Sequence, residues 1–104
     1  MGDPTMLHIV NKSPTERSTF ASCLAHARPG HAVLLIEDGV YAATRGSAAA
    51  ARLATLAPGI EVYVLGPDLD ARAMGRALVE GVRKVDYRGF VELVTRYPRV
   101  QSWL

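Results

Sequence analysis

The sequence has only one cysteine, Cys23, in 104 residues. One thiol excludes an internal disulfide, and with it the small secreted domains that depend on such cross-links, so we expect a reducing compartment. No apolar run approaches the roughly 20 residues that a membrane-spanning helix needs. The first residues also lack the basic region and apolar core of a signal peptide. We therefore expect a cytoplasmic protein that does not bind membranes.

The sequence also lacks a large excess of positive or negative charge. Twelve lysines and arginines face ten acids, for a net charge of +2, and the basic residues are scattered along the chain. Without a basic run, we expect no direct binding of nucleic acid. The length suits one domain with a modest core. Residues 1–5 are polar and Met6 starts the first patterned segment, so we interpret 1–5 as an extension or tag remnant and 6–104 as the single domain.

Short apolar runs that alternate with helical patterns predict an α/β fold. The run at 32–36 has no polar alternation, which is typical of a strand buried on both faces of a parallel sheet. We expect a mostly parallel sheet of four to five strands flanked by helices. The expected strands are 7–10, 32–36, 60–65 and 82–85, and the apolar tail 100–104 is either a fifth strand or a docking segment.

Capping residues predict the helices between these strands. Ser13, Pro14 and Glu16 form a capping-box pattern that starts a first helix reaching Ala27. Ser47 is expected to cap a helix over 48–56, Asp68 one that reaches about 77, and Asp86 one over 87–97. In that last helix we expect Phe90, Val91 and Val94 to point inward.

Cys23 is the first candidate for chemistry. It lies at the edge of the apolar stripe of the first helix, with Thr19 and His26 as neighbours on the helix surface. A free thiol is mostly protonated at neutral pH and needs a neighbour that favours thiolate, a part that a protonated His26 can play. Two interpretations stay open: an inert thiol at the edge of the core, or a half-exposed nucleophile.

Other polar groups predict no bound cofactor or metal. Four acids follow strand ends, but their spacing matches no metal loop, and turns and helix caps account for them. The loop 11–19 is rich in hydroxyls but has no glycine, which argues against a flavin phosphate. His8 and His31 lack the spacing of a zinc site. The four acids are Glu37, Asp38, Asp68 and Asp86.

With these segments assembled, the chain resembles the DsrH/TusB family of sulfur-relay proteins, within the DsrE-like superfamily. The likeness covers almost everything from Met6 onward, and the ordered set of pieces is more specific than any one of them. The pieces are Val10-Asn11-Lys12-Ser13-Pro14, Glu37-Asp38-Gly39-Val40-Tyr41-Ala42-Ala43, Asp68-Leu69 with Ala71-Arg72-Ala73, Val85-Asp86-Tyr87 with Gly89-Phe90-Val91, and Val100-Gln101-Ser102-Trp103-Leu104.

The resemblance implies a DsrE-like, flavodoxin-like fold and a place in a cytoplasmic heterohexamer with DsrE/TusD-like and DsrF/TusC-like subunits. Such a complex passes persulfide sulfur to a DsrC/TusE-like carrier, in sulfur oxidation or in the formation of 2-thiouridine in tRNA. Cys23 matches a cysteine on the first helix of DsrH subunits, so we place the chain nearer to DsrH and sulfur oxidation. The resemblance then implies that Cys23 is a sulfurtransferase-type persulfide carrier and that His26 modulates it. We expect Tyr41 and Trp103 to lie at subunit interfaces.

Two other hypotheses compete with this one. The chain is alternatively a structural subunit of the same complex, whose surface positions its paralogues without passing sulfur. The third hypothesis is a small flavodoxin-like binding module, which a colourless protein without bound nucleotide would count against.

Overall fold

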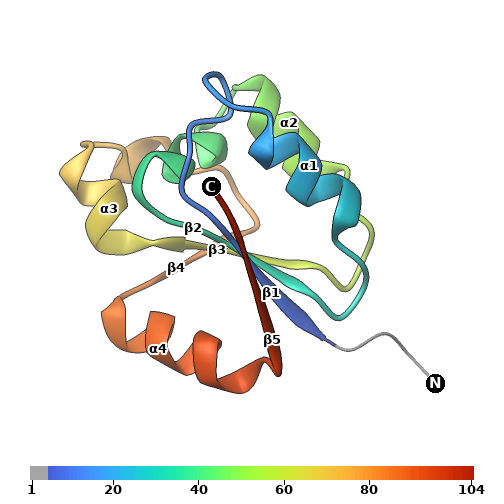
Figure 1. The fold of residues 1–104 in the computed structure, drawn as a ribbon. Coiled ribbons are helices and arrows are strands. Elements are labelled where there is room, and N and C mark those ends of the chain that lie inside the picture. Colours follow the sequence, from blue (N-terminus) through green and yellow to red (C-terminus); the bar gives the residue numbers. More distant parts are fainter. Residues whose placement is uncertain (1–4) are drawn as a thin grey trace.

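A computed structural model describes residues 5–104 of the chain (Figure 1). Apart from Thr5, the expected extension 1–5 lies outside the described residues. Strands and helices alternate along the rest: β1 (Met6–Val10), α1 (Thr19–His26), β2 (Ala32–Leu35), the 3₁₀ helix η1 (Glu37–Ala43), α2 (Ala48–Ala54), β3 (Glu61–Leu65), α3 (Gly66–Ala71), the 3₁₀ helix η2 (Gly75–Ala77), β4 (Val82–Val85), α4 (Tyr87–Arg96) and β5 (Arg99–Trp103).

The five strands form one parallel sheet in the order β4-β3-β2-β1-β5. This confirms the predicted α/β class with a mostly parallel sheet, and the apolar tail is its fifth strand. β2 lies at the centre, and all four of its residues are buried, as its unbroken apolar run predicts. β5 pairs with β1 at one edge of the sheet, so the last strand lies beside the first.

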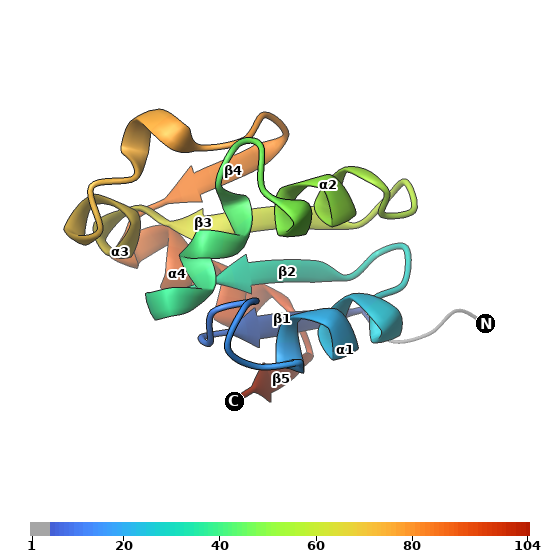
Figure 2. The ribbon, with the colours of Figure 1, turned by 90° about the horizontal axis from the view of Figure 1, so that it is seen from above.

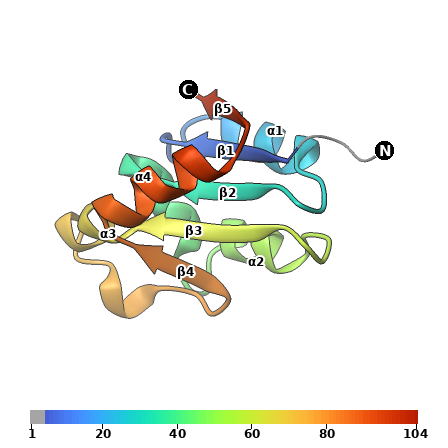
Figure 3. The ribbon, with the colours of Figure 1, turned by 90° about the horizontal axis from the view of Figure 1, so that it is seen from below.

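Helices cover the two faces of the sheet unequally. The segments α1, η1, α2 and α3 lie on one face, whereas the other carries α4, the single helix there among residues 5–104 (Figures 1 and 3). Side chains alternate between these faces along each strand. Val10, Val33 and Val64 belong to the larger core, under α1 and α2. Leu7 and Leu34 belong to the smaller core, against Leu93 of α4.

The first helix begins later than the capping box predicts. The carbonyl of Ser13 accepts hydrogen bonds from the N–H groups of Glu16 and Arg17, both at 3.2 Å, which closes a turn. The hydroxyl of Ser13 bonds to Thr15 (Oγ–Oγ1 3.0 Å) instead of capping a helix. α1 therefore starts at Thr19, and Cys23 is the fifth of its eight residues.

The predicted helix after Asp68 is also wrong in its start and its length. α3 begins at Gly66, directly after β3, because Pro67 at its first turn is already fixed in a helical φ. Asp68 thus lies inside the helix, and its Oδ2 accepts the N–H of Glu37 at 2.6 Å. The helix ends at Ala71, and Ala73 takes a positive φ of 54° before η2.

The other two caps are confirmed, but the inward face of α4 differs from the prediction. Ser47 accepts the N–H of Ala50 (3.0 Å) and Asp86 accepts that of Gly89 (2.8 Å). Phe90 points inward as predicted, together with Leu93 of α4 and Tyr97 directly after it. Val91 and Val94 do not, and are 61% and 36% exposed. No helix within residues 5–104 has the length and apolar character that crossing a bilayer requires.

Candidate functional site

Cys23 lies in the interior of the larger core. Its side chain is 0% exposed and packs in the cluster that contains Phe20, Leu24 and Val33. Burial disfavours the charged thiolate and raises the pKa of Cys23 to about 12. At neutral pH the thiol is therefore protonated, and in this conformation a sulfur atom of another protein cannot reach it.

His26 lies one turn beyond Cys23 but directs its ring elsewhere. Its Nδ1 donates to the carbonyl of Ser22 at 2.8 Å, on its own helix. The ring packs beside the indole of Trp103, with the two centroids 5.2 Å apart. No hydrogen bond joins His26 to Cys23 in the part of the chain that the structure describes, so the expected modulating role stays a prediction.

A hydrogen-bonded chain of three rings lies next to this helix. The indole N–H of Trp103 donates to Nδ1 of His8 at 3.0 Å. His8 must then carry its proton on Nε2, which lies 3.0 Å from Nδ1 of His31 and donates to it. That Nδ1 also accepts the backbone N–H of Arg28 at 3.2 Å, which leaves the proton of His31 on Nε2. The three rings therefore have one consistent set of proton positions.

His8 is held neutral by its surroundings. The ring is 1% exposed, and burial is the main cause that lowers the pKa of His8 from 6.5 to about 4, followed by the charges of His31 and His26. Nε2 of His31, itself buried, has no hydrogen-bond partner among residues 5–104. Sequence spacing did not reveal this cluster, because β1, β2 and β5 bring its members together only through the register of the sheet.

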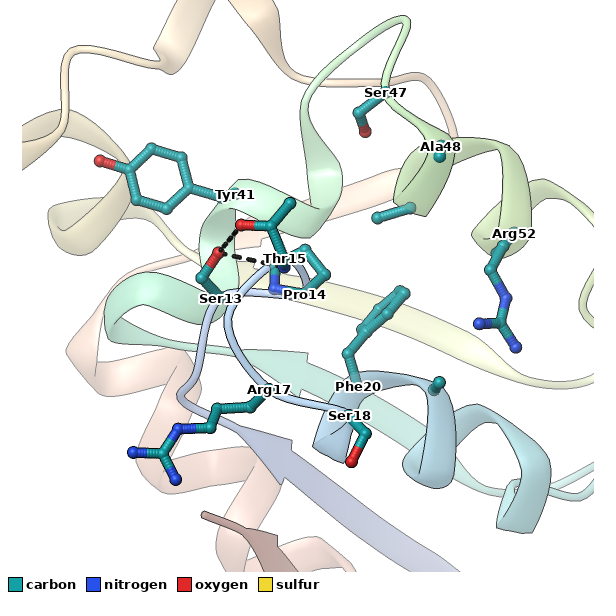
Figure 4. Close-up of a pocket in the computed structure, with 12 residues that line it drawn as sticks. Ser13, Pro14, Thr15, Arg17, Ser18, Phe20, Tyr41, Ser47, Ala48 and Arg52 are labelled. Carbon is teal, nitrogen blue, oxygen red and sulfur yellow. Dashed lines mark hydrogen bonds between the residues drawn. The ribbon is translucent and has the colours of Figure 1, made fainter.

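The two interface candidates lie in different surroundings. Trp103 is half-buried, and its one N–H is used within the chain, so its place at an interface stays a prediction. Tyr41 lies on η1 and is 40% exposed. Its side chain points outward beside Ser13 and Thr15 (Figure 4).

Three of the four acids at the carboxyl ends of the strands have structural partners for their carboxylates. Asp38 forms an ion pair with Arg72 at 3.0 Å, Asp68 binds the backbone of Glu37, and Asp86 caps α4. Among residues 5–104, no group of three or more His, Cys, Asp or Glu side chains is placed to hold a metal ion.

Near the same edge, a hollow lies between α1 and α2. It has a volume of about 560 Å³ and is bounded by the loop after β1, the first turn of α1, Tyr41 and the first turns of α2 (Figure 4). Phe20, Ala21 and Ala49 give it apolar walls, and Arg17 and Arg52 are its charged residues.

Apolar side chains are exposed on the side of the molecule that carries α4. Tyr87, Val91 and Val94 follow one flank of the helix at i, i+4 and i+7, and Tyr87 is 60% exposed. The opposite flank carries Arg96, whose guanidinium donates to the hydroxyl of Tyr63 on β3 at 3.3 Å. The apolar flank therefore faces β1 and β5, where Val100 is 44% exposed. We call Tyr87, Val91, Val94 and Val100 the α4 face.

Comparisons with known proteins agree with this architecture. A family model described as "DsrH like protein" matches residues 12–100. Protein TusB of Pectobacterium parmentieri is 36% identical over 98 residues, which cover 94% of this chain and 100% of that protein. Protein TusB of Salmonella enteritidis PT4 is 38% identical over 84 residues, which cover 81% of this chain and 86% of that protein.

Two solved structures share the fold. The ychN protein from E. coli superposes with a TM-score of 0.77 at 14% identity, over 96% of this chain and 99% of that one. MTH1491 from Methanobacterium thermoautotrophicum, a protein of unknown function, superposes with a TM-score of 0.72 at 20% identity, over 95% of this chain and 99% of that one. The family model covers most of the sequence, and the motifs of the sequence predicted the same assignment. This chain belongs to the DsrH family.

Proposed function

We propose that this chain is a structural subunit of a cytoplasmic sulfur-relay complex, working without a cofactor of its own. The resemblance implies DsrE/TusD-like and DsrF/TusC-like paralogues as its partners, and a DsrC/TusE-like carrier as the acceptor of the sulfur. One contrast carries the proposal: the single thiol, Cys23, is buried, whereas the α4 face leaves apolar side chains in solvent.

The α4 face has the character of a subunit contact. Contiguous apolar side chains on a soluble domain mark surfaces that partners cover, and tyrosine is frequent among the residues that anchor such contacts. Tyr87, Val91 and Val94 project from a regular helix, so little order is lost when a partner binds them. Leu104, 71% exposed, follows β5 at the adjoining edge of the sheet.

The alternative hypothesis is that Cys23 itself accepts persulfide sulfur. Its position on the first helix, where the resemblance places a cysteine of DsrH subunits, favours this role. Transfer proceeds when a thiolate attacks the outer sulfur of the donor, so it needs both access and thiolate character. Cys23 has neither here, and α1 would have to lift away from the sheet.

The proposal also concerns the pathway that the complex serves, either the formation of 2-thiouridine in tRNA or the oxidation of sulfur. The relatives are called TusB, and that name favours the branch of the family that makes 2-thiouridine in tRNA. Cys23 is the feature that favours sulfur oxidation, the second candidate. Mass spectrometry of tRNA nucleosides from a strain that lacks this chain distinguishes them. Loss of 2-thiouridine supports the tRNA branch, and unchanged 2-thiouridine contradicts it.

Co-purification tests the structural role. When the DsrE/TusD-like and DsrF/TusC-like subunits of the same organism are co-expressed with it, the wild-type chain should elute with both in one complex. Val91→Glu places a charge on the α4 face and should release the chain from the complex. Glu92→Lys, which changes the charge on the opposite flank of α4, beside Arg96, should leave the complex intact. Retention of the Val91→Glu chain would contradict the assignment of this face.

A further inference from the structure

A groove follows the gap between α1 and α2, on the face of the sheet opposite the α4 face. Its wider end is the hollow of about 560 Å³ beside Phe20. A second hollow of about 320 Å³ continues it between Leu24 of α1 and Leu56, after the end of α2. Arg52 lines both hollows, so they adjoin at this side chain, and we call the two together the groove. In Figure 2, seen from above, β2 is visible beneath the gap between the two helices.

Small side chains on α2 keep the groove open. The helix presents Ala48 and Ala49 where larger residues would reach across to α1. Phe20, though only 3% exposed, still lends part of its ring to the wall of the groove, and Ala21 continues that wall. The hollow therefore has room for a side chain of another molecule, which would bury apolar surface there.

The charge of the groove has one sign. Arg17 and Arg52 line it, and no acidic residue lines either hollow. Within residues 5–104, neither guanidinium has a hydrogen bond or an ion pair, whereas Arg72 is paired with Asp38. The side chain of Arg52 points from α2 toward α1 (Figure 4). A groove that holds both an unpaired guanidinium and an aromatic side chain suits a carboxylate that arrives with apolar neighbours.

We infer that this groove binds a segment of another polypeptide in which apolar residues flank an aspartate or glutamate. The carboxylate pairs with Arg52, and the apolar side chains pack on Phe20 and the two alanines. The eight residues of α1 span about 12 Å at 1.5 Å per residue, which is the reach of roughly four extended residues. The inference is independent of the sulfur-relay proposal, because the α4 face lies on the other side of the sheet.

Selection from a displayed library of random twelve-residue peptides tests the inference on the full chain. The expected result is a set of binders that share one acidic residue with apolar residues on both sides. A library that yields no binders, or binders without an acid, would overturn it. Inorganic phosphate is added as a competitor. If phosphate displaces the peptide at concentrations similar to the dissociation constant of the peptide, the groove is a small-anion site and the inference fails.

Variants then locate the binding of the selected peptide. Arg52→Glu should weaken it at least about tenfold, the effect of losing one charge-assisted pair, and Ala48→Leu should weaken it by filling the groove. Matched controls are Arg83→Glu on β4 and Ala51→Leu on α2, neither of which lines either of the two hollows. Circular dichroism and the urea midpoint confirm that each variant folds. Equal affinity in the groove variants and their controls would place the peptide elsewhere and contradict the inference.

Discussion

Trp103 donates its indole N–H to Nδ1 of His8 across 3.0 Å, and this bond ties the last strand of the sheet to the first. An indole N–H can only donate, so the bond requires His8 to present an unprotonated Nδ1. If His8 were protonated on both nitrogens, its Nδ1–H would point at the indole N–H of Trp103, and the hydrogen bond would be lost. The attachment of β5 to β1 is therefore linked to the protonation of one buried imidazole.

This link predicts that the protein loses stability in mild acid. The folded pKa of His8, about 4, lies below its ordinary value of 6.5, so the unfolded chain binds the proton more readily. The contribution of His8 is complete above pH 6.5 and is lost as the pH falls toward 4, by up to about 3 kcal/mol. Urea unfolding between pH 7 and 4 measures it. His8→Leu should remove this part of the slope, and equal slopes for both proteins would contradict the prediction.

Shortening the indole should loosen β5. Trp103→Phe keeps an aromatic ring but leaves Nδ1 of His8 buried without a donor, which should cost about 1–3 kcal/mol of unfolding free energy. Val100→Ala changes an exposed residue of the same strand and should cost less than about 0.5 kcal/mol. Denaturant unfolding at pH 7 gives both values, and equal losses would show that the indole bond contributes little.

Cys23 should be nearly inert toward thiol reagents in the folded protein. A pKa of about 12 leaves a thiolate fraction about 1,000-fold smaller than that of an exposed cysteine, and burial adds a barrier of access. The matched comparison is Ala25→Cys combined with Cys23→Ala, which moves the thiol to an exposed position on α1. That variant should react rapidly with a disulfide reagent at pH 7. Similar rates for the two proteins would show that the native thiol is accessible.

Gly39 should tolerate no side chain. η1 passes so close to the end of β1 that a Cβ at Gly39 would collide with the carbonyl group of Val10. Gly39→Ala should therefore cost about 1–3 kcal/mol, the usual effect of forcing an extra carbon into a packed site. Gly75→Ala, where the nearest atom is 3.5 Å from the new carbon, should be neutral or slightly stabilising. Thermal unfolding of the two variants checks the difference.

Local signals in the sequence predicted most of the fold. The unbroken run in β2 and the caps Ser47 and Asp86 depend on neighbours within a few residues, and the structure confirms each of them. Ser13 shows where such signals fail. Its hydroxyl has an equally local partner in Thr15, and that turn prevails over the capping box.

The surroundings of the candidate residues could not be predicted in the same way. The chain from Trp103 through His8 to His31 joins residues 95 and 23 positions apart, and it exists only because β5 and β2 both pair with β1. Cys23 lies at the edge of the helical stripe in the sequence. Whether such a position is buried depends on where the helix begins and which strands it covers, and neither follows from the stripe alone.

Mass spectrometry of this subunit within its assembled complex, after incubation with a persulfide donor, tests the central claim most directly. The account predicts that the partner subunits and the carrier gain sulfur while Cys23 gains none, and that Cys23→Ala leaves delivery to the carrier unchanged. Sulfur on Cys23 that appears and disappears at the rate of delivery would contradict the structural role and make this chain a carrier.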